Sequence, residues 1–298
     1  MQTSNHLLMV EPAAFGYNRE TAVNNLFQQA TGENLQEKAL AEWNGMLDAL
    51  RENRVRVTVI KDSTHPPTPD AIFPNNWISF HPGRYILYPM FAENRRLEPK
   101  KLLTSLELIT NAIEHKTDLR SYEQAGIFLE GTGSMVLDRA HKIAYACRSA
   151  RTHESLFRDC CGIIGFRPVI FDAIDASGQA VYHTNVMMSI GKSVAVVCLD
   201  AITPGIDRHT VTTSIEASGL TLVSITLEQM HAFAGNMLLV RNTADACFWV
   251  MSDRAYQSLT ESQLQALSVD GGFIHAPLQH IEDAGGGSAR CMLAEIFA

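Results

Sequence analysis

The stretch that decides the fold lies near the C-terminal end of the chain and reads Gly285-Gly286-Gly287-Ser288-Ala289-Arg290-Cys291-Met292-Leu293-Ala294-Glu295-Ile296. Three consecutive glycines give a backbone that can turn tightly or approach a ligand closely. Cys291 follows them and opens an apolar run that predicts a strand. A thiol at the start of a buried strand is a candidate nucleophile, although a free cysteine is more often a small buried hydrophobic residue.

The composition of the 298 residues is typical of a compact protein with a large core, because 46% are hydrophobic and 19% are charged. The formal net charge of −8 and the absence of a Lys/Arg cluster argue against a nucleic-acid partner. No apolar run approaches the ~20 residues that a membrane span requires. Residues 1–6 lack the pattern of a signal peptide. We therefore expect one domain over residues 1–298, located in the cytoplasm.

Cysteine spacing gives no sign of a metal site. The chain contains Cys147, Cys160, Cys161, Cys198, Cys247 and Cys291. None of them forms a Cys/His cluster with the spacing of zinc ligands. An even number of cysteines does not imply disulfides in a chain without a secretion signal. We expect a reducing environment, no metal and no cofactor.

One order of predicted elements occurs five times along the chain: a helix, a strand, a loop, a second apolar strand and a returning strand. The helices are expected at about residues 33–53, 99–115, 152–161, 207–218 and 254–267. The second strands are expected to open at Asn76, Ser134, Asn185, Asn236 and Cys291. The gaps between these positions are 58, 51, 51 and 55 residues, which indicates an internal repeat.

The last repeat has no returning strand of its own, and residues 7–10 can supply it and close a ring. We therefore predict an α/β fold in the form of a five-bladed propeller, with the second strands around the axis and the helices outside. The alternative is a generic α/β chain whose elements happen to alternate. In a closed ring, equivalent positions of the repeats meet at one end of the axis. Glu130, His183 and Cys291, which are distant in sequence, would then lie together.

Five segments carry a resemblance to a known superfamily. They are Asp70-Ala71-Ile72-Phe73-Pro74-Asn75-Asn76-Trp77, Glu130-Gly131-Thr132-Gly133, Ser149-Ala150-Arg151-Thr152, His183-Thr184-Asn185 and Cys291. In this order they resemble the penteins, which are guanidine-modifying enzymes such as arginine and agmatine deiminases, dimethylarginine dimethylaminohydrolases and amidinotransferases. The resemblance covers nearly the whole chain. More narrowly, the chain is similar to an amidinotransferase-like branch whose members hydrolyse citrulline.

The resemblance implies three catalytic residues. Cys291 would attack the sp² carbon of a ureido or guanidino group, and a nearby cation or imidazolium would favour its thiolate. His183 would act as the general acid and base. Glu130 would accept hydrogen bonds from substrate N–H groups and orient His183. The alternatives are a core histidine and a glutamate that serves only the loop.

The resemblance also implies residues that bind the rest of the substrate. Arg151 would clamp a carboxylate, since a guanidinium binds it through two hydrogen bonds. Asp70 would pair with the α-ammonium group. The alternatives are a surface arginine at a helix start and an aspartate in a proline-rich turn. Asn236 would lie in the substrate site with Asn76 and Asn185.

Asn76 and Asn185 depart from the pattern of the arginine and agmatine deiminases, which carry aspartates at the matching positions. Two carboxylates neutralise a guanidinium, whereas two amides leave much of its charge unpaired in a buried site. A neutral urea fits amides better, because an amide can both donate and accept. We therefore predict hydrolysis of L-citrulline to ornithine, CO₂ and ammonia through a covalent intermediate on Cys291.

Two other functions stay open at this stage. One is an arginine or agmatine deiminase, or an amidinotransferase, acting on a guanidino substrate. The other is a non-catalytic pentein that only binds a partner, like the ribosome-associated initiation factor of this fold, although the acidic charge disfavours an RNA partner. A papain-like protease does not fit, because its cysteine precedes its histidine. We expect a small ureido or guanidino amino acid as the ligand, no nucleic acid, no membrane and a homodimer as a possible assembly.

Overall fold

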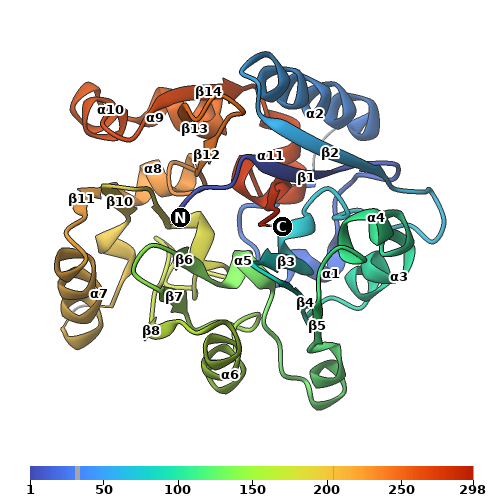
Figure 1. The fold of residues 1–298 in the computed structure, drawn as a ribbon, viewed down its shortest axis with the longest axis horizontal. Helices are drawn as coiled ribbons and strands as arrows, with labels where there is room; N and C mark the ends of the chain where they lie inside the picture. Colours follow the sequence, from blue (N-terminus) through green and yellow to red (C-terminus); the bar gives the residue numbers. More distant parts are fainter. Residues whose placement is uncertain (31–33, 204, 298) are drawn as a thin grey trace.

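The computed structural model describes residues 1–30, 34–203 and 205–297 of the chain. These residues form five three-stranded sheets, which lie around the centre of the molecule in Figure 1. The first four consist of β3 (Ile78–His81), β4 (Arg84–Leu87) and β5 (His115–Asp118); β6 (Val136–Asp138), β7 (Ile143–Cys147) and β8 (Arg167–Phe171); β9 (Met188–Ile190), β10 (Val194–Val197) and β11 (Thr221–Ser224); and β12 (Leu238–Arg241), β13 (Cys247–Ser252) and β14 (Gly272–Ala276). In each, the middle strand pairs antiparallel with the strand before it and parallel with the strand after it.

The fifth sheet joins the two ends of the chain. It consists of β15 (Ala294–Glu295), β1 (His6–Glu11) and β2 (Arg56–Lys61). Strand β1 pairs antiparallel with β15, with Leu7 opposite Glu295, and parallel with β2. The prediction that residues 7–10 complete the last repeat is therefore confirmed. The mixed α/β architecture with five equivalent sheets is also confirmed. Each sheet is open within the described residues, so the closed propeller stays a prediction.

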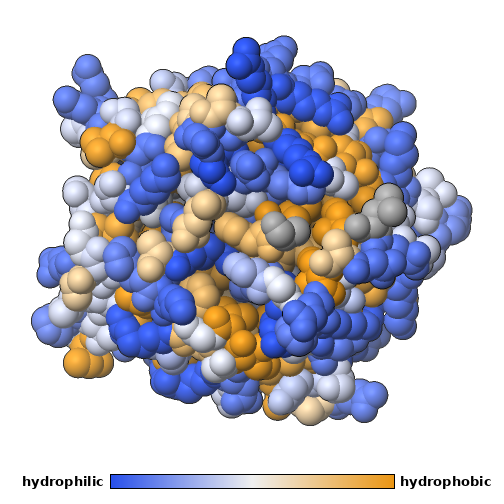
Figure 2. Space-filling model, viewed as in Figure 1, coloured by the Kyte–Doolittle hydropathy of each residue, from blue (hydrophilic) through white to orange (hydrophobic). Residues whose placement is uncertain are grey.

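The longer helices lie outside the sheets in Figure 1: α2 (Leu35–Glu52), α6 (Glu154–Ile164), α7 (Ile206–Ala217) and α10 (Glu261–Ser268). Helix α2 buries Trp43, Met46 and Leu50, and this spacing follows the helical period. Glu33, at the start of the predicted first helix, lies outside the described residues. On the face shown in Figure 2, hydrophilic side chains dominate the outer rim. None of the described helices has the length and hydropathy that crossing a membrane would need.

Three predicted elements were wrong in extent. The helix expected over residues 99–115 is divided into α3 (Glu98–Leu102), a 3₁₀ turn at Thr104–Leu106 and α4 (Glu107–Thr110), because Thr104 and Ser105 are weak helix formers. The helix expected over 254–267 is divided into α9 (Asp253–Ser258) and α10, because Thr260 forms a capping box with Gln263 and starts a new helix.

The sequence also predicts a strand near residues 118–122 from its place after the second helix, but strand β5 ends at Asp118 and Arg120–Ala125 forms a 3₁₀ helix. The Asp118 carboxylate accepts the backbone N–H of Arg120 at 3.2 Å. Such a bond turns the chain away from the sheet.

The polar residues expected to open the second strands lie instead in short turns just before them. Pro74–Asn76, α5 (Gly131–Ser134), Thr184–Val186 and Ala289–Met292 are such turns, and strands follow them. In the fourth repeat the backbone N–H of Asn236 donates to the Phe233 carbonyl at 2.8 Å. The residues after each turn are apolar and buried. Because this apolar run predicts a strand, the strands were expected to begin a few residues too early. The turns Pro74–Asn76 and Thr184–Val186 both contact α5, and the turn Ala289–Met292 contacts Pro74–Asn76. The polar side chains of these turns therefore lie close together.

Candidate active site

Cys291 lies in the turn Ala289–Met292 and is buried, with 2% of its surface exposed. Its Sγ accepts hydrogen bonds from the side-chain amides of Asn236 at 3.3 Å and Asn185 at 3.5 Å. Burial raises the pKa of the Cys291 thiol, whereas these two amides and the nearby Arg290 charge act in the opposite direction. The free protein therefore holds Cys291 as a thiol near neutral pH, surrounded by donors that can stabilise a thiolate.

His183 and Glu130 form a buried pair, with His183 Nε2 at 2.8 Å from Glu130 Oε2. A carboxylate can only accept, so Nε2 carries the proton and Nδ1 is left as the basic atom. Burial lowers the pKa of His183 to about 4, against the opposing effect of Glu130. Burial also opposes ionisation of Glu130, but the Arg151 charge and the bond from His183 outweigh it and lower the pKa of Glu130 to about 2. At neutral pH the pair is a neutral imidazole on a carboxylate.

Gly133 has no side chain, and this allows the His183 and Asn76 side chains to approach each other. A Cβ at this position would lie 2.8 Å from His183 Nδ1 and would collide with Asn76 Nδ2. Glycine is therefore required here for close packing, and not for an unusual backbone conformation. The sequence motif that begins at Glu130 thus contains the glycine against which both His183 and Asn76 pack.

A small pocket joins most of the predicted site residues. Cys291, His183, Asp70, Asn76 and Arg151 all line it. The other described lining residues are Thr21, Asn25, Phe73, Arg95, Tyr182, Gly285, Gly286 and Gly287. Glu130 contacts two residues that line the pocket. Its Oε2 accepts a hydrogen bond from His183 Nε2 and lies 3.5 Å from Arg151 Nη1. The sequence-predicted residues are thus brought together, although Asn185 and Asn236 contact Cys291 without lining the pocket.

Asp70 has one free carboxylate oxygen. Its Oδ2 accepts from Asn18 at 2.8 Å and from Thr21 at 3.0 Å. Its Oδ1 is buried and has no hydrogen-bond partner in the described part of the chain. A buried unpaired carboxylate oxygen is costly, so this atom suits a donor that arrives with a ligand.

Most of the N–H groups of the Arg151 guanidinium are already bonded within the protein, so few remain for a substrate carboxylate. Its Nε and Nη2 donate to Asn24 Oδ1 at 2.9 and 2.6 Å, and Nη2 also donates to the Thr21 carbonyl at 2.7 Å. Its guanidinium lies 5.0 Å from the centre of the Tyr182 ring. Only Nη1, which faces Glu130 at 3.5 Å, keeps an N–H for a further partner.

Sequence reasoning missed Arg95. This arginine is 2% exposed and lies beside Asn76, with Nη1 donating to Asn76 Oδ1 at 2.8 Å. Glu98 holds it through bonds of 2.8 and 3.1 Å to Nε and Nη2. Burial disfavours the charge, but Glu98 and Asp70 outweigh it and raise the pKa of Arg95 above its usual value. Arg95 lies in a run of charged residues that is typical of a solvated surface, so nothing in the sequence marked it.

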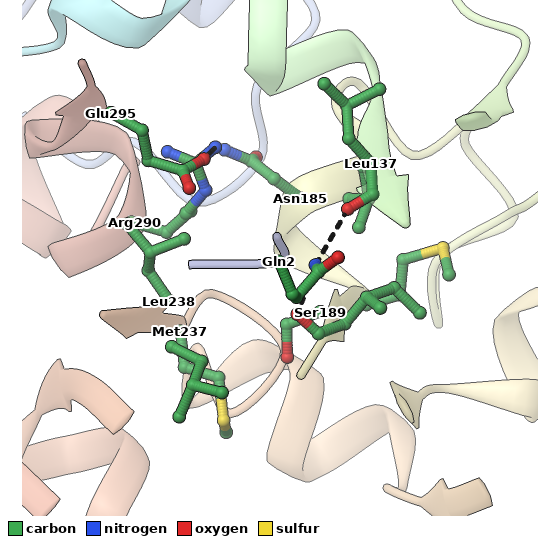
Figure 3. Close-up of a pocket in the computed structure, with 12 residues that line it drawn as sticks. Gln2, Leu137, Asn185, Ser189, Met237, Leu238, Arg290 and Glu295 are labelled. Atoms are coloured by element: carbon green, nitrogen blue, oxygen red, sulfur yellow. Dashed lines mark hydrogen bonds and ion pairs between the residues drawn. The ribbon is translucent and has the colours of Figure 1, made fainter. Parts of the chain in front are cut away.

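Asn185 and Asn236 serve the nucleophile. Besides Cys291, Asn236 bonds to the Asn185 carbonyl at 2.9 Å and accepts the Arg290 backbone N–H at 3.1 Å. Asn185 lines a second cavity, shown in Figure 3, which also contains Arg290 and Glu295. Gln2 bounds this cavity and donates to the carbonyls of Leu137 at 3.0 Å and Ile190 at 3.1 Å. The two asparagines therefore bond to the thiol but do not line the pocket.

The segment between β1 and α2 was also missed as part of the site. Asn18, Thr21, Asn25 and Gln28 are buried polar residues in it. Asn25 donates to the Gly286 carbonyl at 3.2 Å, and Gln28 donates to the Ala284 carbonyl at 3.2 Å. Their spacing of three to four residues on a polar stretch was the available signal, since it places them on one side of a turn-rich segment.

Comparison with known proteins identifies the family. A family model described as "N,N dimethylarginine dimethylhydrolase, eukaryotic" matches residues 11–298. A search of curated proteins found no match. Among solved structures, ArgZ, an arginine dihydrolase from the ornithine–ammonia cycle in Cyanobacteria, superposes with a TM-score of 0.76 at 16% identity, over 97% of this chain and 40% of that chain.

Two further solved structures match this chain over nearly the full length of both chains. The N-terminal domain of ArgZ with bound product has a TM-score of 0.75 at 15% identity, over 98% of this chain and 97% of that one. A dimethylarginine dimethylaminohydrolase carrying a 4-chloro-2-hydroxymethylpyridine adduct has a TM-score of 0.67 at 15% identity, over 99% of each chain. The present chain thus spans about 40% of the length of the complete arginine dihydrolase. Because the family model begins at residue 11 and runs to the last residue, the chain belongs to the dimethylarginine dimethylhydrolase family and to the pentein superfamily of guanidino-group-modifying enzymes.

Proposed function

We propose that this protein is a cysteine-dependent C–N hydrolase that converts L-citrulline and water to ornithine, CO₂ and ammonia. We choose a ureido substrate because of the hydrogen bond between Arg95 and Asn76. A guanidinium can only donate, so the 2.8 Å bond from Arg95 orients Asn76 with its carbonyl oxygen toward Arg95. One N–H of Asn76 donates to Asn75 at 3.0 Å, and the other has no partner within the described residues, so it is available to a ligand of the pocket that Asn76 lines.

A free amide donor suits the oxygen of a urea and not the N–H groups of a guanidinium. In addition, the Arg95 cation lies in the same pocket and would repel a second cation. Glu130, the carboxylate nearest to His183, already faces Arg151. Glu98 and Glu130 already pair with Arg95 and Arg151, so neither carboxylate is left unpaired for a guanidinium, and this favours a neutral substrate.

In the first step, the Cys291 thiol passes its proton to His183 Nδ1, and the thiolate attacks the ureido carbon. Glu130 stabilises the imidazolium that forms, as its short bond to Nε2 allows. The donors around Sγ from Asn185 and Asn236 stabilise the thiolate before the attack. The tetrahedral intermediate then expels its terminal amino group, which leaves as ammonia with the proton from His183. Cys291 is left as a thiocarbamate ester of the substrate.

In the second step, His183 removes a proton from water, which attacks the thiocarbamate carbon. The C–S bond breaks, Cys291 regains a proton from His183, and N-carboxyornithine leaves. This carbamate decomposes to ornithine and CO₂. The sum of both steps is citrulline plus water to ornithine, CO₂ and ammonia, and no oxidant or cofactor is needed.

The amino-acid end of the substrate would bind at Asp70 and Arg151. The free Asp70 Oδ1 is suited to the α-ammonium group, and the remaining N–H of Arg151 Nη1 is suited to the α-carboxylate. The two roles expected for Asp70 and Arg151 from the sequence stay predictions. A cytoplasmic location and a homodimer stay predictions.

A second candidate is hydrolysis of a guanidino substrate such as arginine or a methylated arginine. The family description and the arginine dihydrolase neighbours favour it. It uses the same three catalytic residues, and Glu130 would then supply the negative charge for the cation.

The test is to incubate the purified protein separately with citrulline, arginine and dimethylarginine, and to follow ornithine, citrulline and ammonia. We expect ornithine and ammonia from citrulline, and no product with Cys291→Ala. Turnover of arginine or dimethylarginine but not of citrulline would replace the first candidate by the second.

A further inference from the structure

A buried carboxylate outside the pocket interacts with the backbone that carries the nucleophile. Glu282 lies on α11 (Gln279–Gly285) and is 0% exposed. Its Oε1 accepts the Ser288 hydroxyl at 2.6 Å. Its Oε2 lies 3.2 Å from Arg254 Nε. No role in substrate binding explains this residue, since it does not line the pocket.

Ser288 links Glu282 to the thiol. The Ser288 carbonyl accepts the backbone N–H of Cys291 at 3.0 Å and that of Met292 at 3.3 Å. Ser288 is itself 0% exposed, so water does not compete for these bonds. A shift of its side chain would therefore move the turn that holds Sγ between Asn185 and Asn236.

Arg254 holds Glu282 from the other side. It comes from α9, and its Nη2 also donates to Asp283 at 2.8 Å. The Asp283 carbonyl in turn accepts the backbone N–H of Gln29 at 2.6 Å, from the segment that covers the pocket. Arg254 thus ties two acidic residues of α11 together, next to the glycines that precede Cys291.

The charge of Glu282 changes in the neutral pH range. Burial raises its pKa to about 7, while Ser252, the bond from Ser288 and the Arg254 charge act in the opposite direction. The charged groups that face it are Arg254 on α9 and Asp283 on α11. From the other packed elements, Ser252 of β13 and Gln28 of the N-terminal segment are neutral, and Glu42 of α2 pairs with His280 at the start of α11.

We propose that Glu282 is a positioning residue for the nucleophile: ionised Glu282, held by Arg254, fixes Ser288 and thereby orders the turn of Cys291. The proposal rests on the proposed function only in taking Cys291 as the nucleophile. When Glu282 is protonated, its attraction to Arg254 is lost and the turn loosens. The amides of Asn185 and Asn236 then stabilise the thiolate less well, and Cys291 becomes less reactive.

The test is the rate at which iodoacetamide labels Cys291 between pH 5.5 and 8.5, measured by peptide mass spectrometry without substrate. Glu282→Gln keeps an acceptor for Ser288 but is never charged. The ratio of the wild-type rate to the Glu282→Gln rate should be about one below pH 6 and roughly tenfold above pH 8, the scale expected from misplacing a reacting group. Ser288→Ala should slow labelling at every pH.

Glu42→Gln is the matched control. Glu42 accepts the backbone N–H groups of His280 and Ile281 at 2.9 and 3.0 Å, so it also supports α11 but does not contact the nucleophile turn. Its ratio to wild type should not change with pH. A ratio near one at all pH values for Glu282→Gln, or the same pH step in Glu42→Gln, would overturn the proposal. Labelling requires no turnover, so failure of the citrulline assay would leave this result standing.

Discussion

Replacing Asn76 by aspartate should move the substrate preference from ureido to guanidino compounds. The substitution is nearly isosteric and puts a negative charge where the Asn76 amide lines the pocket. Arg95 Nη1, now 2.8 Å from Asn76 Oδ1, would bond to the new carboxylate. The second carboxylate oxygen takes the place of Nδ2, so the pocket loses a donor and gains an acceptor.

The size of the effect follows from the hydrogen bonds involved. A hydrogen bond to a charged group contributes about 1.5–3 kcal/mol, and losing the donor to the urea oxygen costs about 1 kcal/mol. Arg95 already faces Glu98 at 2.8 Å and Asp70 at 4.0 Å, so it will neutralise only part of the new charge. We expect the ratio of kcat/KM for arginine to that for citrulline to rise by roughly 10- to 100-fold, since 1.36 kcal/mol corresponds to a factor of ten.

The assay measures kcat/KM for both substrates, with ammonia release as the common signal. Asn75→Asp is the control, because Asn75 is equally buried but does not line the pocket. If the ratio of the two kcat/KM values is unchanged in Asn76→Asp, and circular dichroism shows a folded protein, then Asn76 does not discriminate between a charged and a neutral substrate. That result would refute the reasoning. An equal shift in Asn75→Asp would assign the effect to general electrostatics.

Three other predictions follow from the geometry. Gly133→Ala should reduce kcat at least about tenfold, because its Cβ would push against His183 and Asn76; steady-state kinetics with a melting curve checks this. Glu130→Gln should lower kcat by about 10²–10⁴-fold, because the His183 imidazolium loses its counter-charge; a kcat within threefold of wild type would contradict that role. The raised pKa of Glu282 means that the folded state binds its proton more tightly, so wild-type stability relative to Glu282→Gln should fall as pH rises from about 4.5 to 7; urea titrations at pH 5 and pH 8 test the sign.

The repeat and its chemistry could be predicted because they are encoded locally. Each second strand is a short apolar run after a polar residue, and the unpaired last repeat pointed to residues 7–10 as its partner strand. The pairing of β1 with β15 confirmed this. The gathering of Cys291, His183 and Glu130 followed from their equivalent positions in the repeats.

The remaining features depend on contacts between distant segments. Arg95 is buried only because Glu98, Asp70 and Asn76 surround it, and a charged run in the sequence does not reveal such partners. Likewise, the sequence did not reveal that the Asn185 amide bonds to Cys291 Sγ and that Asn185 lines the cavity in Figure 3; its contact with the substrate stays a prediction. Sequence position gave the neighbourhood of each side chain and not the direction in which it points.

The central claim is that Cys291 forms a covalent intermediate with citrulline. The most direct measurement is the intact mass of the protein after mixing with citrulline and quenching with acid within the first turnover. We predict a species heavier than the free protein by citrulline less ammonia, located on the Cys291 peptide and absent from Cys291→Ala. Ornithine formation without any such adduct, or at an undiminished rate in Cys291→Ala, would contradict the account.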